Sequence, residues 1–305
     1  MANYFSIFLV ALTAISGAIW LLDALLWAPK RKEKIALATA NTQGTIDIET
    51  IEKIAPVPHV VDTAQQFFPV IAFVLVLRSF LYEPFQIPSG SMMPTLLVGD
   101  FILVEKFTYG LKDPVMRKKF VDIGKPERGD IVVFKFPENP NVDFIKRVVG
   151  MPGDTLIYKN QQVFVRPACP SNNNCQPMQP VKLELVDRGA FEQQGMPLDR
   201  FVETLGNIEH EILRNPRAFQ QIQHYYTQEG EPVAQWQIPE DQYFVLGDNR
   251  DNSRDSRYWG FVPDELLVGK AVAIWISFEF ERPASSTLPS WVPTGVRFNR
   301  VGGIH

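Results

Sequence analysis

The chain has few cysteines and no excess of positive charge. Its 305 residues carry 30 basic and 34 acidic side chains, a formal net charge of −4, which argues against a nucleic-acid-binding surface. The two cysteines, Cys169 and Cys175, have a spacing that fits neither a zinc site nor a redox Cys-x-x-Cys motif. They are either two free thiols or one small disulfide loop. Export from the cytoplasm would favour the disulfide, which would contribute roughly 2 kcal/mol of stability.

The sequence also lacks the usual signatures of hydrolases that depend on histidine. Neither Gly-x-Ser-x-Gly nor His-Glu-x-x-His occurs, and the four histidines lie outside the motif-bearing stretches described below. A serine nucleophile in this chain would therefore need another base, and a lysine can take that role.

No basic residue precedes Lys30. Residues 4–27 form one apolar run, and about 20 such residues cross a bilayer as a helix. A cleaved signal peptide is the alternative, but it would have basic residues at its front. The basic cluster at residues 30–34 follows this run directly, which places that loop in the cytoplasm and the N-terminus outside. We expect a retained membrane helix over residues 1–28 and a cytoplasmic loop over residues 29–66.

A second apolar run begins at residue 67 and continues to Tyr82, with Arg78 reaching to an interface. We expect a second membrane helix over residues 67–84. Two crossings place everything from Pro84 onward outside the cytoplasm. Ser91 lies seven residues after Pro84, so an extended chain would hold it at most ~25 Å beyond the end of the helix. Whatever this region does, it does close to the membrane surface.

From Phe101 onward the sequence indicates short strands separated by turns. The β-branched or aromatic stretches are residues 101–105, 130–136, 142–149, 243–246 and 271–277. Residues 155–239 are more polar, less patterned and contain both cysteines. The pattern predicts a mainly β core formed by residues 85–154 and 240–305, with residues 155–239 inserted into it as a subdomain.

Residues 86–96 (Gln-Ile-Pro-Ser-Gly-Ser-Met-Met-Pro-Thr-Leu) form the first stretch with a chemical signature. Pro88 and Pro94 exclude an ordinary helix or central strand. Gly90 lets the backbone bend between Ser89 and Ser91, so a kinked loop presents two hydroxyls. Alone, this stretch indicates no more than a proline-rich turn.

The second stretch places a lysine inside an apolar strand. In a strand over residues 142–149, side-chain alternation puts Lys146 on one face with Val142, Phe144 and Val148, while Asp143 and Arg147 can pair on the other. Desolvation lowers the pKa of a lysine, and a change from ~10.4 to ~7.5 corresponds to about 4 kcal/mol. Such a lysine is a general base at neutral pH. The alternative is a lysine that reaches solvent at the sheet edge.

The third stretch, residues 247–260, is rich in short polar side chains and alternating charges. A calcium loop is one interpretation, but the glycine at its sixth position and the bidentate glutamate are missing. Asx-turns with Asp–Arg pairs explain most of these residues better. Such a loop could also place one hydroxyl against Lys146.

Together, the three stretches resemble those of bacterial type I signal peptidases, the membrane-bound leader peptidases. Residues 88–96 match the nucleophile motif of that family, residues 144–154 its lysine motif, and residues 247–257 its C-terminal motif. The resemblance implies two antiparallel β-sheets with an inserted β-rich subdomain after two transmembrane helices. It also implies a serine endopeptidase that needs no cofactor and removes signal peptides from exported preproteins.

The same resemblance assigns roles to four polar side chains. Ser91 would be the nucleophile and Lys146 the general base. The Ser89 hydroxyl and the Ser91 backbone N–H would form the oxyanion hole, and Ser253 would orient the lysine.

Other residues are implied as structural support or as contacts to substrate. Gly247 and the ion pair between Asp255 and Arg257 would support the site, and Cys169 and Cys175 match a disulfide present in part of the family. The pockets for small residues one and three positions before the cut would be lined by Phe85, Ile87, Met92, Leu96, Phe144 and Ile145. Strand alternation, however, directs Phe144 and Ile145 to opposite faces.

The expected partners are preproteins with signal peptides, membrane lipid and, by proximity, the secretion machinery, with no nucleic acid. The expected location is the bacterial inner membrane, with the catalytic domain on its outer face. Two alternatives have other functions: a maturation protease with few substrates, and a membrane-tethered binding protein in which Ser91 is a turn residue. Self-cleaving repressors share serine–lysine chemistry, but the two membrane spans argue against them.

Overall fold

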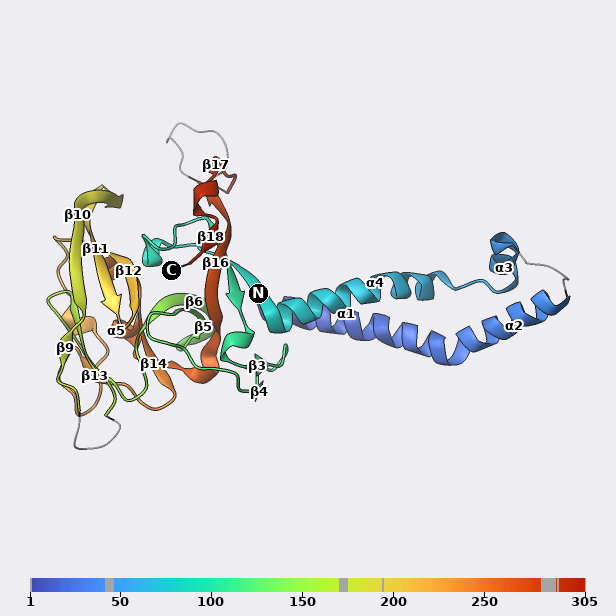
Figure 1. Ribbon diagram of the computed structural model, residues 1–305, viewed down its shortest axis with the longest axis horizontal. Helices are drawn as coiled ribbons and strands as arrows, with labels where there is room; N and C mark the ends of the chain where they lie inside the picture. The colour runs from blue at the N-terminus through green and yellow to red at the C-terminus, as the bar shows by residue number, and fades with distance from the viewer. Residues whose placement is uncertain are drawn as a thin grey trace. The chain divides into compact units, whose positions relative to one another are not determined.

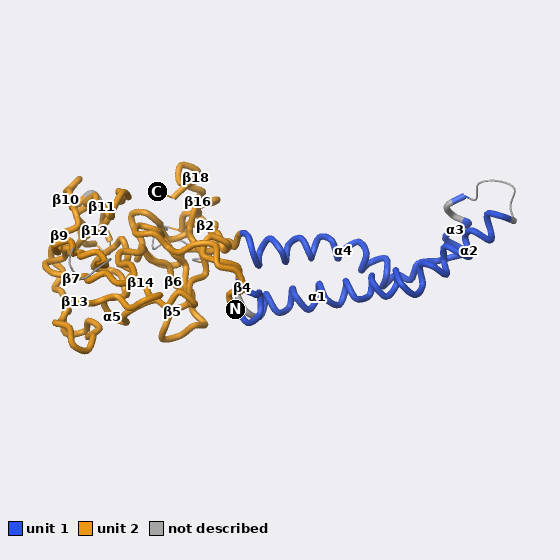
Figure 2. Tube along the Cα trace, turned by 60° about the horizontal axis from the view of Figure 1, so that its bottom comes forward, with its two compact units in different colours: residues 1–81, 112–117 blue, residues 82–111, 118–305 orange. Residues whose placement is uncertain are grey.

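The computed structural model describes residues 2–41, 47–169, 175–193, 195–280, 289 and 291–304. These residues form two compact units (Figure 2). The first comprises residues 1–81 and 112–117, and the second residues 82–111 and 118–305.

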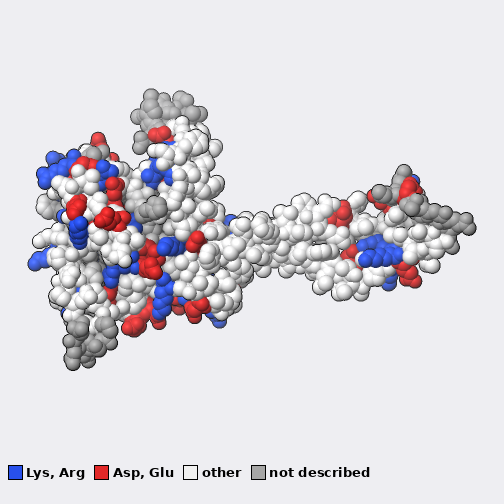
Figure 3. Space-filling model, viewed as in Figure 1, with Lys and Arg blue, Asp and Glu red and all other residues white. Residues whose placement is uncertain are grey.

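The first unit is helical. Its elements are α1 (Ala2–Leu22), a π-helical turn (Asp23–Trp27), α2 (Ala28–Asn41), α3 (Ile48–Ile54), α4 (His59–Val76) and a second π-helical turn (Leu77–Leu81). Two stretches, Tyr4–Ala40 and His59–Leu81, are long and apolar enough to cross a membrane, and Figure 3 shows little charge along α1 and α4. The helices α1 and α4 pack together where Gly17 faces Phe68 and where Trp20 contacts the same ring, with centroids 5.3 Å apart.

The helices extend further than the apolar runs. The first continues through α2 to Asn41, where we expected a loop, and α4 begins at His59, ahead of the apolar run at residue 67. Residues 28–41 are mostly alanine, lysine and other good helix formers. Loss of apolar character marks the end of a membrane span, but it does not end a helix.

The second unit is built mainly from antiparallel strands, as predicted. Its large sheet has the order β1-β2-β16-β5-β6-β14-β15, and β17 and β18 pair with β16 (Figure 1). These strands are β1 (Tyr82–Gln86), β2 (Asp100–Glu105), β5 (Ile131–Phe136), β6 (Asn139–Gly150), β14 (Gln242–Leu246), β15 (Val262–Pro263), β16 (Leu267–Glu279), β17 (Gly295–Val296) and β18 (Gly302–Gly303). All five strands predicted from the sequence are present. The short β3 (Leu111–Lys112) and β4 (Lys119–Val121) lie where the chain passes between the two units.

Residues 155–239 form two smaller sheets within the same compact unit. One has the order β13-β7-β8-β9 and the other β10-β11-β12. Their strands are β7 (Thr155–Lys159), β8 (Gln162–Arg166), β9 (Gln179–Pro180), β10 (Lys182–Gln193), β11 (Met196–Leu205), β12 (Ile208–Arg214) and β13 (Gln235–Gln237). A disulfide joins Cys169 to Cys175. The remaining helix, α5 (Ser256–Trp259), follows β14.

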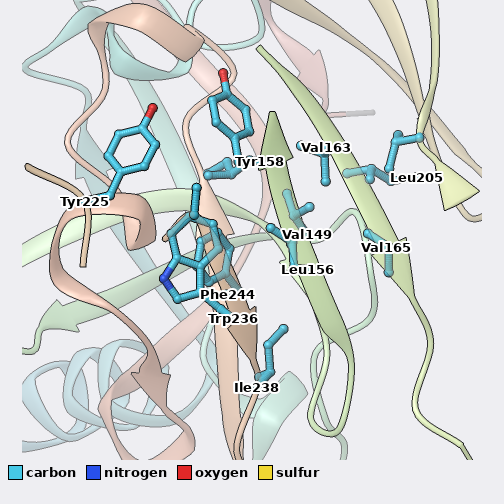
Figure 4. Close-up of a cluster of buried hydrophobic side chains, with 13 residues drawn as sticks. Val149, Leu156, Tyr158, Val163, Val165, Leu205, Tyr225, Trp236, Ile238 and Phe244 are labelled. Atoms are coloured by element: carbon cyan, nitrogen blue, oxygen red, sulfur yellow. The ribbon is translucent and has the colours of Figure 1, made fainter. Parts of the chain in front are cut away.

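The inserted segment shares a hydrophobic core with the large sheet. Trp236 of β13 is fully buried against Phe244 of β14, and Leu156 and Tyr158 of β7 belong to the same cluster (Figure 4). A second cluster lies under the loop that carries Ser91, and Phe144 packs against a third. The insertion is therefore packed onto the core that presents the candidate site.

Candidate active site

Two buried side chains hold the loop that carries Ser91 against the large sheet. Ser91 lies in a 3₁₀ turn (Gly90–Met92) after β1. Met92 and Leu96 are fully buried in the cluster below, and each such side chain contributes about 1.5–3 kcal/mol by burial. The backbone N–H of Ile87 donates to the carbonyl of Asp100 at 2.8 Å. The serine is thus presented by a loop anchored at both ends.

Lys146 lies directly beside this serine. Its side chain is 4% exposed, and its Nζ donates to Ser91 Oγ at 2.9 Å and to the carbonyl of Ile145 at 2.8 Å. Burial lowers the pKa of Lys146 from 10.5 to about 8, although the carboxylates of Asp255 and Asp248 act to raise it. The amine is within proton-transfer distance of the hydroxyl, and a substantial neutral fraction is present near neutral pH.

Ser89 and Ser253 occupy different positions relative to this pair. Ser89 Oγ lies 3.5 Å from Ser91 Oγ, so the two hydroxyls are adjacent. The Ser253 hydroxyl is buried and contributes to the low pKa of Asp255. Within the described residues it makes no hydrogen bond of normal geometry. No hydrogen bond therefore joins Ser253 to Lys146 within the described residues, and the orienting role of Ser253 stays a prediction.

The third stretch packs behind the serine and supports it. Asp255 accepts two hydrogen bonds from the Arg257 guanidinium, at 2.8 and 2.9 Å, and one from the Gly247 N–H at 3.1 Å. A Cβ on Gly247 would lie 2.2 Å from Ser253 Oγ and 2.5 Å from the carbonyl oxygen of Ser91. This position therefore requires glycine because two chain segments meet there.

Asn249 links this stretch to the serine loop. Its backbone N–H donates to the carbonyl of Ser91 at 3.1 Å, and its side-chain Nδ2 donates to the carbonyl of Gly90, also at 3.1 Å. Nδ2 also donates to Oε1 of Gln193 at 2.9 Å. The sequence analysis did not single out Asn249. An asparagine in a polar loop gives no signal of its own, because it is typical of any turn.

The expected pair between Asp143 and Arg147 is wrong. Arg147 instead forms two hydrogen bonds with Asp248, at 2.9 and 2.8 Å, and Asp143 pairs with Lys135 at 2.8 Å. Lys135 lies directly opposite Asp143 in the β5–β6 ladder, which explains the second pair. Arg147 is buried together with Asp248, a partner distant in the sequence that strand alternation alone cannot reveal.

Two further ionisable residues reach this network from the inserted segment. Glu203 of β11 forms a buried, bidentate ion pair with Arg250. His210 of β12 is buried with its Nε2 3.3 Å from Glu203 and 3.9 Å from Asp248. Burial raises the pKa of Glu203, but Arg250 and His210 more than offset this and lower it to about 2. Burial and Arg147 lower the pKa of His210.

The predicted substrate-contacting residues fall into two clusters. Ile87, Met92 and Leu96 are buried in the cluster under the serine loop, and Phe85 and Ile145 pack against it. Phe144 packs instead against the cluster that contains Phe134, Phe136 and Trp259. As alternation indicated, Phe144 and Ile145 face different parts of the core. Phe85, Phe144 and Ile145 keep partly exposed surface.

Comparison with known proteins identifies the family. The family model described as "Signal peptidase, peptidase S26" matches residues 60–276. The chain belongs to the signal peptidase family, peptidase S26. The signal peptidase I of Pseudomonas fluorescens is 42% identical over 316 residues, which cover 99% of each chain. That of Pseudomonas aeruginosa is 42% identical over 319 residues, which cover 100% of each chain.

Among solved structures, a signal peptidase I from Enterococcus faecalis is 25% identical and matches 49% of this chain and 98% of its own, with a TM-score of 0.26. The assignment to the signal peptidase family therefore rests on the sequence matches. It confirms the resemblance that the three motifs indicated and makes the chain a serine peptidase. Two apolar N-terminal helices in a signal peptidase place the chain in the inner membrane, with the β unit on its extracytoplasmic side.

Proposed function

We propose that this chain is a membrane-bound endopeptidase that removes N-terminal signal peptides from exported preproteins, with Ser91 as nucleophile and Lys146 as general base. One observation supports this most strongly: a buried lysine amine with a lowered pKa lies 2.9 Å from a serine hydroxyl. A serine becomes a useful nucleophile only when a base accepts its proton. The relatives named signal peptidase I supply the substrate class.

The proposed reaction passes through an acyl-enzyme. Neutral Lys146 accepts the Ser91 proton as Oγ attacks the scissile carbonyl, and the resulting ammonium returns that proton to the leaving amine as the peptide bond breaks. A water molecule then attacks the ester, again giving its proton to Lys146, and Ser91 is released with its hydroxyl restored. At a pH well below 8 the lysine is protonated and cannot begin the cycle.

The oxyanion formed in each step needs donors aimed at it. We assign this role to the Ser89 hydroxyl, which lies beside Ser91 Oγ, and to the backbone N–H of Ser91. Ser253 is proposed to orient the lysine once substrate is bound. Its buried hydroxyl, without a hydrogen bond of normal geometry in the described part of the chain, is costly to leave unpaired, so a contact made only during the reaction would account for it.

Residues behind the nucleophile are proposed to fix its position. Asn249 holds the carbonyls of Gly90 and Ser91, and the pair of Asp255 and Arg257 holds Gly247 next to them. In this proposal residues 85–154 and 240–305 supply the chemistry, and residues 155–239 support it through Glu203 and His210.

Substrate and lipid contacts are proposed from exposure. Phe85, Phe144 and Ile145 are candidates for the walls of the pockets that accept small residues, because they keep accessible surface near the pair. Trp275 and Phe298 are large exposed aromatic side chains of the β unit, and aromatic residues favour membrane interfaces. We propose that they contact lipid.

The proposal is tested by cleavage of a preprotein by the purified full-length protein in detergent. Ser91→Ala and Lys146→Ala are each expected to reduce the cleavage rate by at least about 10²–10⁴-fold. Lys135→Ala is the matched control: Lys135 is also a buried lysine, on the adjacent strand, but it pairs with Asp143. It is expected to cut at close to the wild-type rate. No cleavage of several preproteins by the folded wild-type protein would instead favour a non-catalytic binding protein, and unchanged cleavage by both alanine variants would refute the assignment of Ser91 and Lys146.

A further inference from the structure

A pocket of about 620 Å³ lies within the helical unit, in the size range of small-molecule sites, about 300–1,000 Å³. Its walls are mostly apolar and come from two helices, with Ile19 and Leu22 on α1 and Val60 and Val61 on α4. Trp27 also lines it. The pocket therefore offers hydrocarbon contact on two sides.

Three basic side chains line the same pocket: Lys30, Arg31 and Lys34. Arg31 is already paired with Asp23 through two hydrogen bonds of 2.6 Å, and Gln65 of α4 donates to the same carboxylate at 3.3 Å. Lys30 and Lys34 are exposed and lie four residues apart, on the same face of α2. Among the described residues that line the pocket, their charges are available to a ligand, and Figure 3 shows basic side chains gathered at the start of α2.

The position of this pocket along the chain fixes its depth in the bilayer. It lies where the apolar run of residues 4–27 ends, at Trp27, shortly before the basic cluster of residues 30–34, and such a cluster marks the cytoplasmic side. Anionic lipid headgroups are concentrated there, and basic pockets between membrane helices on that side bind them.

We propose that this pocket binds one anionic phospholipid of the cytoplasmic leaflet. Its phosphate lies between Lys30 and Lys34, and an acyl chain lies along Ile19, Leu22 and Val60. Neither lysine forms an ion pair with a carboxylate of the described residues, and two such ammonium groups favour an anionic headgroup over a zwitterionic one. The apolar walls favour a lipid over free phosphate, because a small anion would leave them unfilled. The proposal concerns binding and does not depend on the catalytic assignment.

The test is native mass spectrometry of the full-length protein in a neutral detergent, titrated with phosphatidylglycerol or with phosphatidylcholine. One phosphatidylglycerol is expected to bind in preference to phosphatidylcholine. Lys30→Gln and Lys34→Gln are each expected to weaken it about fivefold, since a basic residue near an anionic headgroup contributes about that much. Lys32→Gln is the matched control, since Lys32 belongs to the same basic cluster but does not line the pocket.

Two further arms separate the headgroup from the acyl chain. Glycerol 3-phosphate, which has the phosphate but no acyl chain, is expected not to displace bound phosphatidylglycerol at the concentrations at which phosphatidylglycerol itself binds. Val60→Trp, at an exposed position of the pocket wall, is expected to reduce lipid binding without changing the charge. Equal binding of both lipids, an equal loss in Lys32→Gln, or displacement by glycerol 3-phosphate would each overturn the proposal. The helical circular dichroism signal shows that each variant is folded.

Discussion

Replacing Lys146 by methionine should stabilise this protein at neutral pH while it abolishes cleavage. The lysine is buried beside Ser91, and burial lowers its pKa from 10.5 to about 8. The folded state therefore binds this proton less tightly than the unfolded state does. Stability is lost as the pH falls from about 10.5 through about 8, and the full cost is present below that range.

The size of this effect follows from the same values. Lowering the pKa from 10.5 to about 8 corresponds to about 3 kcal/mol. Methionine has a similar length and no charge, so Lys146→Met does not incur this cost. The free energy of unfolding of the variant minus that of wild type is therefore expected to be about 3 kcal/mol larger at pH about 7 than at pH about 10.5.

Denaturant unfolding of the full-length protein in detergent, at both pH values and followed by near-UV circular dichroism, measures this difference. Lys135→Met is the control. It removes a buried lysine that has a carboxylate partner, and it is expected to give no such gain at neutral pH. A Lys146→Met variant whose advantage over wild type is the same at both pH values would refute the claim that burial destabilises the lysine ammonium.

Three other changes test the support around the site. Gly247→Ala should lower the cleavage rate about 100-fold with little loss of secondary structure, because its Cβ would displace the Ser91 carbonyl; a near-normal rate would show that the close approach is unimportant. Glu203→Gln should destabilise the fold by about 3–5 kcal/mol, since it leaves Arg250 buried without its partner. The double variant that also carries Arg250→Met should regain part of the lost stability, measured by thermal unfolding. Cys169→Ser should lower the free energy of unfolding by about 2 kcal/mol. A reducing agent should lower that of the wild type by the same amount and leave that of the variant unchanged.

The sequence was sufficient for the strands and for the pairing of Ser91 with Lys146. Alternation of apolar residues locates a strand wherever one face is buried, and a lysine on that face stands out because burial of a charge is costly. The family motifs then connected that lysine to a serine on a distant loop. Both inferences rest on local patterns that tertiary structure leaves intact.

The sequence was not sufficient for the ion pairs behind the site. Arg147 was expected to pair with Asp143, its neighbour on the same strand face, yet it bonds Asp248. Glu203 and His210 gave no signal, because an ionisable residue in a polar insertion is ordinary until a buried partner is known. Pairings between distant segments depend on how the sheets pack, and no local periodicity encodes that.

The pH dependence of preprotein cleavage tests the central claim most directly. For the wild-type protein between pH about 5 and about 10, kcat/KM is expected to rise with an apparent pKa near 8, the value that burial gives Lys146. Lys146→Ala should lose this activity across the whole range. A rate that does not change over this range, or cleavage that survives the loss of Lys146, would contradict the assignment of this lysine as the base.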